Sequence, residues 1–552
     1  MGLLMRNSMS AVARRVLLLW LRRLRRLRPL RLLRQPRLPR SLSVIEITQA
    51  VMVACMIALG SSAAWAEGAP RGTSDLESRI KRVLARKVLK NASVGIHVVR
   101  ASDGQPVYGR GSDALLIPAS NQKILTALAA LERFGPTHRF STRVWAPAPP
   151  NIEGVVDELI VQGGGDPAMN SEDWWRLAAD LRREGLRGVK GDVRVDDSHF
   201  DGPGWHPSWG RPSSRAYHAA VGALTANYGT FFVSIWPQKD VGSSVLVDVD
   251  PPVKYLRVRN QARTAARGTR PKLSVGRDRG RQTEGPPEEI VQVSGVARQG
   301  DQVDRFPRSV LDPGLYAGSV LAYQLGANGV FVDGAVGRSS AGPAGYSLIL
   351  DRPGRTVAEA VQLCMKYSNN SIAETLVKNL GAWAGTPLSG DPARQGTWPV
   401  GIRAVREGLG RMQVDLSEAN LVDGSGLSIQ NRVTPRVLVQ ALSAGQSSFA
   451  FGPEFMASFP IAERDGTLEK RLRGKQGRIR AKTGLLSDAK VTALSGFAER
   501  QDGETLIFSI LVNGHSGSSR GAMDAVDEIA AALADADLGS LATPKVAARE
   551  TP

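Results

Sequence analysis

The 552-residue sequence has few of the residues on which disulfide and metal chemistry depend, with two cysteines and six histidines. Cys55 lies in an apolar stretch near the N-terminus, so removal of that stretch would leave Cys364 alone and exclude an internal disulfide framework. Cys364 falls within an apolar helical pattern, which predicts a buried structural thiol. The histidines show no metal-ligand spacing, and no H-E-x-x-H or P-loop motif occurs. The sequence therefore predicts neither a metal site nor a cofactor.

Acidic residues are nearly absent from the first 66 positions, which contain twelve arginines, no lysine and Glu46 as the only acid. Much of the formal net charge of +19 therefore belongs to this leader. An apolar stretch at 50–60 and small residues ending in Ala64-Trp65-Ala66 follow the arginines. This order predicts a secretory signal peptide with a long basic leader over residues 1–66, and export to the periplasm. The apolar stretch is short for a membrane span, but a retained signal anchor stays an open alternative.

A chain of this length is too long for one hydrophobic core and predicts several domains. Apolar spacing predicts a helix at 74–90, and alternation predicts a strand at 93–101 that continues into a hairpin. The C-terminal part predicts three strands and a closing helix. These lie at 478–483, 491–498, 505–513 and 520–537.

The predicted elements at the two ends are incomplete by themselves and would complete one another. Residues 67–139 and 341–540 are therefore predicted to form one discontinuous α+β domain. Residues 140–340, rich in short strands, glycine and proline, would form an insertion, and 541–552 a tail. Within the insertion, 256–282 has many arginines and few apolar residues, which predicts an exposed loop. A patch that binds anionic surfaces is the alternative.

The first chemically informative string is Ser120-Asn121-Gln122-Lys123, at the start of an apolar helical pattern. Residues i and i+3 share a helix face, so Lys123 is expected beside Ser120. Burial would lower the pKa of the lysine, because the charged form loses hydration, and a neutral amine can accept the serine proton. The same spacing starts at Ser78, in a surface helix, and at Ser487, between two strands. An ordinary capped helix with a solvated lysine is the alternative at Ser120.

Two later strings supply partners for such a serine. In Ser368-Asn369-Asn370, the hydroxyl can relay a proton and Asn370 can hydrogen-bond a substrate peptide group; helix capping is the alternative. Lys482-Thr483-Gly484 closes a predicted strand, where the cation and hydroxyl suit a carboxylate and the glycine permits close approach. Together the strings indicate serine acyl transfer with neither histidine nor aspartate in the catalytic role.

The three strings, in this order, resemble those of the D-alanyl-D-alanine carboxypeptidase/endopeptidase family, the low-molecular-mass class C penicillin-binding proteins. Within that family Ser371–Glu374 has counterparts after the second string, which favours Ser368 and Asn370 over the overlapping Tyr367 and Asn369. The resemblance also covers a gap of 248 positions between the first two serines, and three further stretches. Those stretches are Gly164–Pro167, Asp312–Ala317 and Asp423–Ser428.

This resemblance implies an α+β fold with a β-lactamase/transpeptidase-like catalytic domain, an antiparallel sheet flanked by helices. The domain would be discontinuous, with inserted, mostly β domains. Ser120 would be the acylated nucleophile and Lys123 its activating partner. Ser368, Asn370 and Lys482 would complete the catalytic set.

The resemblance implies a substrate site as well. Thr483 and Gly484 would bind the substrate, and the backbone N–H groups of Ser120 and Leu485 would form the oxyanion hole. Asp196 would contact a side chain of the stem peptide. No cofactor or metal is implied.

The implied activity is hydrolysis of peptidoglycan stem peptides ending in D-Ala-D-Ala, and of cross-links between them. β-Lactam antibiotics would acylate the same serine. Nucleic acid is not a predicted partner, whereas peripheral contact with a membrane and the oligomeric state stay open. A β-lactamase of the same fold and a scaffold protein with little turnover are the alternatives.

Overall fold

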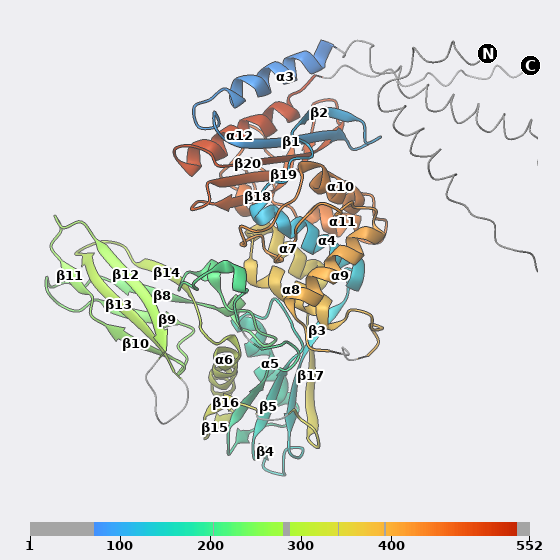
Figure 1. Ribbon diagram of the computed structural model, residues 1–552. Coiled ribbons are helices and arrows are strands. Elements are labelled where there is room, and N and C mark those ends of the chain that lie inside the picture. Colours follow the sequence, from blue (N-terminus) through green and yellow to red (C-terminus); the bar gives the residue numbers. More distant parts are fainter. Residues whose placement is uncertain (1–70, 203, 280–287, 340–341, 391–393, 538–552) are drawn as a thin grey trace, which may run out of the picture. The chain divides into compact units, whose positions relative to one another are not determined.

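A five-stranded antiparallel sheet is built from both ends of the described chain (Figure 1). The computed structural model describes residues 71–537 except 203, 280–287, 340–341 and 391–393, so the predicted signal peptide and tail lie outside the described residues. The strand order is β18-β19-β20-β1-β2, and Ser93 pairs with Asn513. The predicted hairpin and C-terminal strands are confirmed. Their bounds are β1 Ser93–Arg100, β2 Pro106–Arg110, β18 Ile479–Leu486, β19 Val491–Glu499 and β20 Thr505–Asn513.

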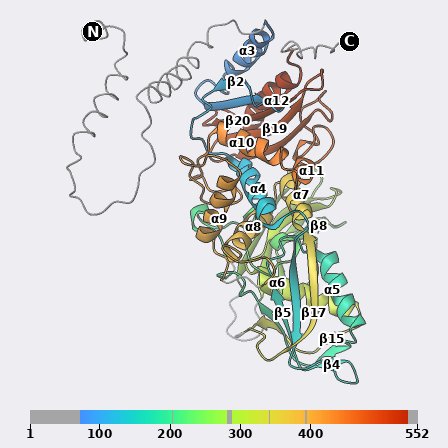
Figure 2. The same cartoon turned by 90° about the vertical axis from the view of Figure 1, so that its right-hand side faces the viewer.

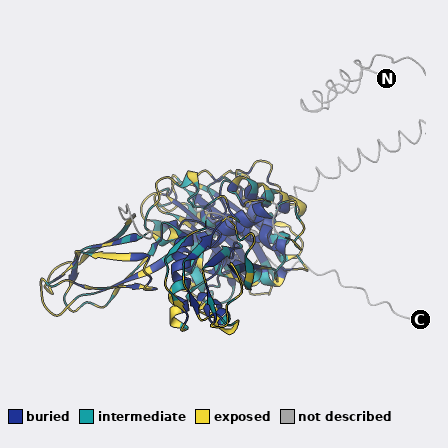
Figure 3. Ribbon diagram, turned by 90° about the horizontal axis from the view of Figure 1, so that it is seen from below, coloured by how far each residue is buried: buried dark blue, intermediate teal, exposed yellow. Residues whose placement is uncertain are grey.

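Helices cover both faces of this sheet, because its central strands alternate apolar residues toward two cores. In β20, Phe508 and Ile510 pack with α3 and α12, while Ile507 and Leu511 pack with the helical layer that contains α4 (Figure 1). Burial on both sides explains why β19 and β20 are apolar along most of their length. Figure 3 shows buried residues gathered in the interior and exposed residues along the periphery.

The helices predicted at 74–90 and 520–537 are confirmed, although the first ends at Leu84. No helix in the described part of the chain is long and apolar enough to cross a membrane. The first layer contains α3 Arg71–Leu84 and α12 Ser519–Ala534. The second contains α4 Gln122–Phe134, α7 Val357–Tyr367, α8 Asn370–Ala382, α9 Trp398–Arg411, α10 Pro435–Gln446 and α11 Gly452–Ala457.

A second five-stranded sheet begins where α4 ends and returns the chain to α7. Its order is β16-β7-β5-β3-β17, with β3 and β17 antiparallel, so the chain leaves and re-enters along paired strands (Figure 2). The insertion was predicted to end at residue 340, but β17, which belongs to this sheet, lies entirely after that position. The strands are β3 Arg139–Ala146, β5 Leu159–Gly163, β7 Val193–Asp196, β16 Val336–Arg338 and β17 Ser347–Thr356; the helices of this region are α5 Ser171–Arg183 and α6 Pro313–Ala327.

Two further sheets and one small sheet fill the rest of the insertion. They give it the mostly β character that the resemblance implied. The strands are β4 Val155–Val156, β6 Gly188–Val189, β8 Thr230–Trp236, β9 Leu246–Asp250, β13 Glu289–Arg298, β14 Asp304–Ser309 and β15 Phe331–Val332.

The prediction of an exposed loop for the arginine-rich segment is wrong, because the described residues of that segment form strands. These are β10 Leu256–Asn260, β11 Arg263–Ala265 and β12 Lys272–Arg279, all paired with β13. Leu256 and Val275 are buried against β13 while neighbouring side chains are exposed. A two-residue period with one thin apolar face is enough for a strand, and the high arginine content obscured it.

Candidate active site

Ser120 lies in a single 3-10 turn, Ala119–Asn121, that leads directly into α4. Ala119 is buried and has a φ of 47°. That left-handed conformation is costly for alanine and persists only where the surroundings enforce it. A loop around Gly426 supplies the constraint, because a Cβ atom there would lie 1.8 Å from the Ala119 carbonyl oxygen. The backbone that presents Ser120 is therefore held by a distant segment of the chain.

Lys123 is fully buried, because α4 packs against other helices and the central sheet on nearly every face. Its Nζ atom lies 3.0 Å from Ser120 Oγ, 2.7 Å from Asn370 Oδ1 and 2.7 Å from the Ser425 carbonyl oxygen. Burial lowers the pKa of Lys123 from 10.5 to about 8, although nearby acidic groups partly oppose the shift. A neutral amine can donate to Asn370 and Ser425 and accept the Ser120 proton. This geometry suits a proton acceptor.

Ser368 and Asn370 lie at the break between α7 and α8. Ser368 ends α7 with a φ of 57°, and its Oγ accepts a hydrogen bond from Lys482 Nζ at 2.8 Å. Asn370 begins α8 and accepts from Lys123, while its Nδ2 donates to the Tyr217 carbonyl oxygen at 2.8 Å. The structure thus brings Ser368 to Lys482 and Asn370 to Lys123. It also ties Asn370 to the insertion.

The overlapping residues of the alternative register have other surroundings. Asn369 caps α8, where its side chain accepts from the Ile372 N–H at 3.1 Å. Tyr367 is 68% exposed. The geometry therefore favours Ser368 and Asn370 as the members of the site.

Lys482 is fully buried in β18 and faces the same group of residues. Besides Ser368, its Nζ contacts the Thr483 carbonyl oxygen at 2.7 Å. Burial, and then the charge of Lys123, lower its pKa well below the usual 10.5. Thr483 Oγ1 donates to Thr467 Oγ1 at 2.8 Å. A substrate carboxylate placed here would contact the Thr483 hydroxyl and the Lys482 amine. Its negative charge would help to keep that amine protonated.

β18 is the edge strand of the central sheet, so every second backbone N–H and C=O along it has no partner within that sheet. The Ala481 N–H donates outward to the Pro460 carbonyl oxygen at 3.0 Å. Backbone groups alternate sides along an antiparallel strand, so those of Thr483 and Leu485 also point to the outer edge. The Leu485 N–H thus has the direction that an oxyanion hole requires.

A buried carboxylate holds the loop that contacts Lys123, a contribution that the motif analysis missed. Glu374 accepts from the Ser425 N–H at 2.7 Å, the Gly424 N–H at 3.1 Å and Trp398 Nε1 at 2.9 Å. Burial, and then Asp423, raise the pKa of Glu374. The only sequence signal was that Glu374 and the Asp423–Ser428 stretch belong to the family resemblance.

Cys364 lies beside this cluster, where its Sγ contacts the Asn369 carbonyl oxygen at 3.6 Å. It is fully buried, as the sequence predicted, and burial raises its pKa to about 11. The other S-x-x-K serines lie elsewhere. Ser78 lies in α3 and Ser487 in the turn after β18. Among the residues that the structure describes, no group of three or more His, Cys, Asp or Glu could hold a metal ion.

Asp196, predicted to contact the substrate, lies in β7 of the insertion. It accepts hydrogen bonds from Gln162 Nε2 and from the Ser198 N–H, each at 2.9 Å. Over the described residues, no hydrogen bond or ion pair links it to the cluster around Ser120. The contact of Asp196 with the substrate stays a prediction.

Comparison with known proteins places this arrangement in a family. The sequence model of the D-Ala-D-Ala carboxypeptidase 3 (S13) family matches residues 76–533. A D-alanyl-D-alanine carboxypeptidase of Actinomadura sp. (strain R39) is 35% identical over 501 residues, which cover 87% of this chain and 88% of that protein. The crystal structure of penicillin binding protein 4 (dacB) from Haemophilus influenzae has a TM-score of 0.66 at 22% identity, covering 84% of this chain and 98% of that one. The same protein has been solved in complex with a β-lactam, with a TM-score of 0.63.

Proposed function

The chain belongs to the D-Ala-D-Ala carboxypeptidase 3 (S13) family and is a serine-type D-Ala-D-Ala carboxypeptidase, and from this premise we propose that Ser120 carries its acyl-enzyme. Ser120 Oγ attacks the carbonyl carbon of the penultimate D-alanine of a peptidoglycan stem peptide. The peptide bond breaks, terminal D-alanine leaves, and water hydrolyses the resulting ester. β-Lactams acylate the same oxygen.

The contacts of Lys123 are the observation that carries this proposal. Its amine lies 3.0 Å from Ser120 Oγ and has a lowered pKa, so it accepts the serine proton as the new bond forms. Asn370 and the Ser425 carbonyl hold the nitrogen in place. Positioning by two fixed acceptors reduces the reorganisation that proton transfer requires.

The leaving amine must gain a proton when the peptide bond breaks. Ser368 is suited to deliver it, because its hydroxyl accepts a hydrogen bond from Lys482 and can donate its own proton to the leaving nitrogen. Lys482 replenishes that proton. Lys123 would thus accept the proton of the nucleophile, and Lys482 would supply a proton, through Ser368, to the leaving amine.

The edge strand β18 is suited to bind the substrate. The N–H groups of Ser120 and Leu485 would stabilise the charge on the carbonyl oxygen in the tetrahedral intermediate. Lys482 and Thr483 would bind the terminal carboxylate. Gly484 keeps the strand free of a side chain where the peptide passes. Hydrolysis of cross-links between stem peptides would use the same groups.

The substrate is a cell-wall polymer, so we place the enzyme outside the cytoplasmic membrane, in the periplasm. The predicted signal peptide lies outside the described residues and stays a prediction.

Mass spectrometry after exposure to a fluorescent penicillin tests the assignment of Ser120. We expect the label on the peptide that contains Ser120, and none on the Ser120→Ala protein. Release of D-alanine from a pentapeptide should disappear in the same variant. Wild-type release by Ser120→Ala would refute the proposal, and rapid hydrolysis of the penicillin adduct would indicate a β-lactamase instead.

A further inference from the structure

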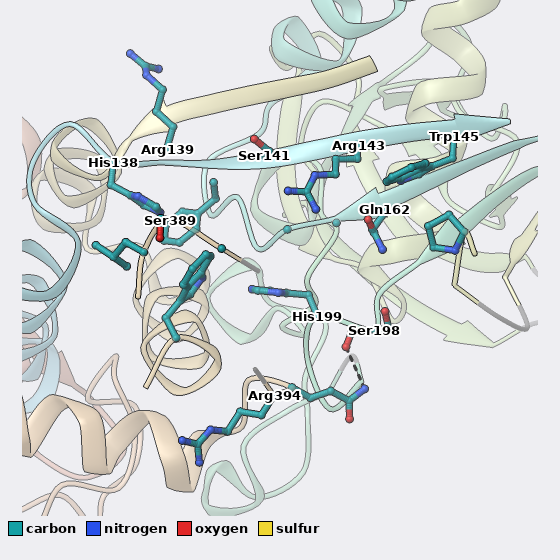
Figure 4. A pocket seen from close by; sticks show the side chains of 18 residues that line it. His138, Arg139, Ser141, Arg143, Trp145, Gln162, Ser198, His199, Ser389 and Arg394 are labelled. Atoms are coloured by element: carbon teal, nitrogen blue, oxygen red, sulfur yellow. Dashed lines mark hydrogen bonds between the residues drawn. The ribbon is translucent and has the colours of Figure 1, made fainter. Parts of the chain in front are cut away.

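A cavity of about 810 Å³ lies at the opposite end of α4 from Ser120. Ser120 precedes the helix, whereas His138, which lines the cavity, follows it; a 13-residue helix is about 20 Å long. The walls come from β3, from β5, from the segment after β7 and from the segment after α8 (Figure 4). Ser120 and Lys482 are not among the lining residues. The cavity is therefore separate from the site described above.

The lining of this cavity is cationic. Arg139, Arg143 and Arg394 line it together with two histidines, and no aspartate or glutamate is among the described lining residues. Arg143 is paired with Asp351 at 3.2 Å, and Arg394 donates to the Ala384 carbonyl oxygen at 2.8 Å. Arginine presents a planar fork of donors that fits a carboxylate. The charge of the lining favours an anionic occupant.

The same cavity also offers aromatic faces and polar side chains. Figure 4 shows Arg143 and Gln162 pointing toward the space that His199 faces, while Arg139 and Arg394 point away from it. Trp145 and Trp383 add aromatic rings, and several serines and glutamines add hydroxyl and amide groups. Aromatic rings with a few placed polar groups are typical of sites for organic ligands, whereas a site for a small inorganic anion needs no ring.

We propose that this cavity binds an acidic glycopeptide, with a sugar ring against Trp145 and a carboxylate on Arg143. The inference rests on the proposed function, because peptidoglycan is a polymer of sugars that carry acidic peptides. A second segment of the polymer would occupy the cavity while a stem peptide lies at Ser120. The cavity would thus favour polymeric substrate over short peptides.

Binding to insoluble peptidoglycan by Ser120→Ala protein tests the proposal without turnover. Adding Arg143→Gln should weaken sedimentation with the polymer about tenfold, as expected for losing a charged, two-pronged hydrogen-bond donor. Asp351→Asn is the matched control, since it removes the partner of Arg143 and keeps the guanidinium. Unchanged binding by the arginine variant, or an equal loss in Asp351→Asn, would overturn the proposal.

Soluble probes separate the parts of the ligand. A disaccharide that carries an acidic peptide should bind more tightly than the peptide alone or an uncharged N-acetylglucosamine oligomer. The difference should shrink in the arginine variant. If Arg143→Gln lowers the melting temperature, Arg143→Lys, which keeps the charge and loses the planar fork of donors, supplies the test. Equal binding of all three probes to parent and variant refutes the inference.

Turnover distinguishes this inference from the proposed function. In enzyme that retains Ser120, the arginine variants should lower the rate of polymer hydrolysis, relative to the rate of short-peptide hydrolysis, at least threefold. An unchanged ratio defeats the second site and leaves the role of Ser120 intact. Activity that survives Ser120→Ala defeats the proposed function, whatever the arginine variants do.

Discussion

Lys123 Nζ is surrounded by three oxygen atoms in a buried site, and its protonation state should govern acylation. Because burial lowers its pKa to about 8, the neutral amine increases as pH rises toward that value. The rate of acylation by a fluorescent penicillin should therefore rise from pH 6 and level off above about 8. Stopped-flow fluorescence measures this profile. A rate that is flat across the range would contradict the role of Lys123 as proton acceptor.

Substitution of Lys123 tests the same role directly. Lys123→Met should slow acylation by about 10²- to 10⁴-fold, the usual contribution of a general base. Lys81→Met is the matched control, because Lys81 ends the same S-x-x-K spacing on the exposed surface of α3. That control should be acylated at the wild-type rate. Melting temperatures of both proteins show whether the fold is retained.

Lys482 should affect carboxylate-bearing substrates most. Lys482→Met should lower kcat/KM for a peptide ending in free D-alanine about 10- to 100-fold more than for its C-terminal amide, since a charged hydrogen bond is lost only with the former. Steady-state kinetics with the two peptides give the ratio. Equal losses on both peptides would assign Lys482 to proton delivery through Ser368 alone.

At the scale of elements, the loop around Gly426 holds the turn that presents Ser120. Gly426→Ala should slow acylation at least tenfold, because the new Cβ atom meets the Ala119 carbonyl oxygen and displaces the turn. The positive φ of 79° adds a cost of about 1–2 kcal/mol. Penicillin labelling and thermal melting separate the two effects.

Gly503 provides the control for that substitution. It has a φ of +84° in the turn after β19, and a Cβ atom there would meet nothing within 4 Å. Gly503→Ala should therefore lower the melting temperature without slowing acylation. If both variants were acylated equally fast, the contact between Gly426 and Ala119 would have no part in positioning Ser120.

The sequence predicted side-chain chemistry better than it predicted backbone contacts. Ser120, Lys123 and Lys482 could be identified from the sequence because their residue types and spacing are unusual together. The carbonyl groups of Ser425 and Tyr217, which contact Lys123 and Asn370, left no signal, since every residue carries a carbonyl. The strands of the central sheet were predictable from their alternation. The arginine-rich strands were not, because one thin apolar face supports them.

For the whole molecule, the active site is divided between two segments that the insertion separates, and the central sheet holds them together. Ser120 and Lys123 precede the turn at Arg267, and Ser368 and Lys482 follow it. Pairing of β1 with β20 along eight residue pairs should keep the segments associated after the chain is cut at that turn. A recognition site for a specific protease inserted after Arg267 allows the cut.

The cut protein should be acylated as fast as the uncut protein with the same insertion. On a denaturing gel, fluorescent penicillin should label only the N-terminal fragment, which carries Ser120. Label on the C-terminal fragment would contradict the assignment of the nucleophile. Loss of acylation upon cutting would show that the β10–β13 sheet, whose strands lie apart from the central sheet in Figure 1, nevertheless supports the site.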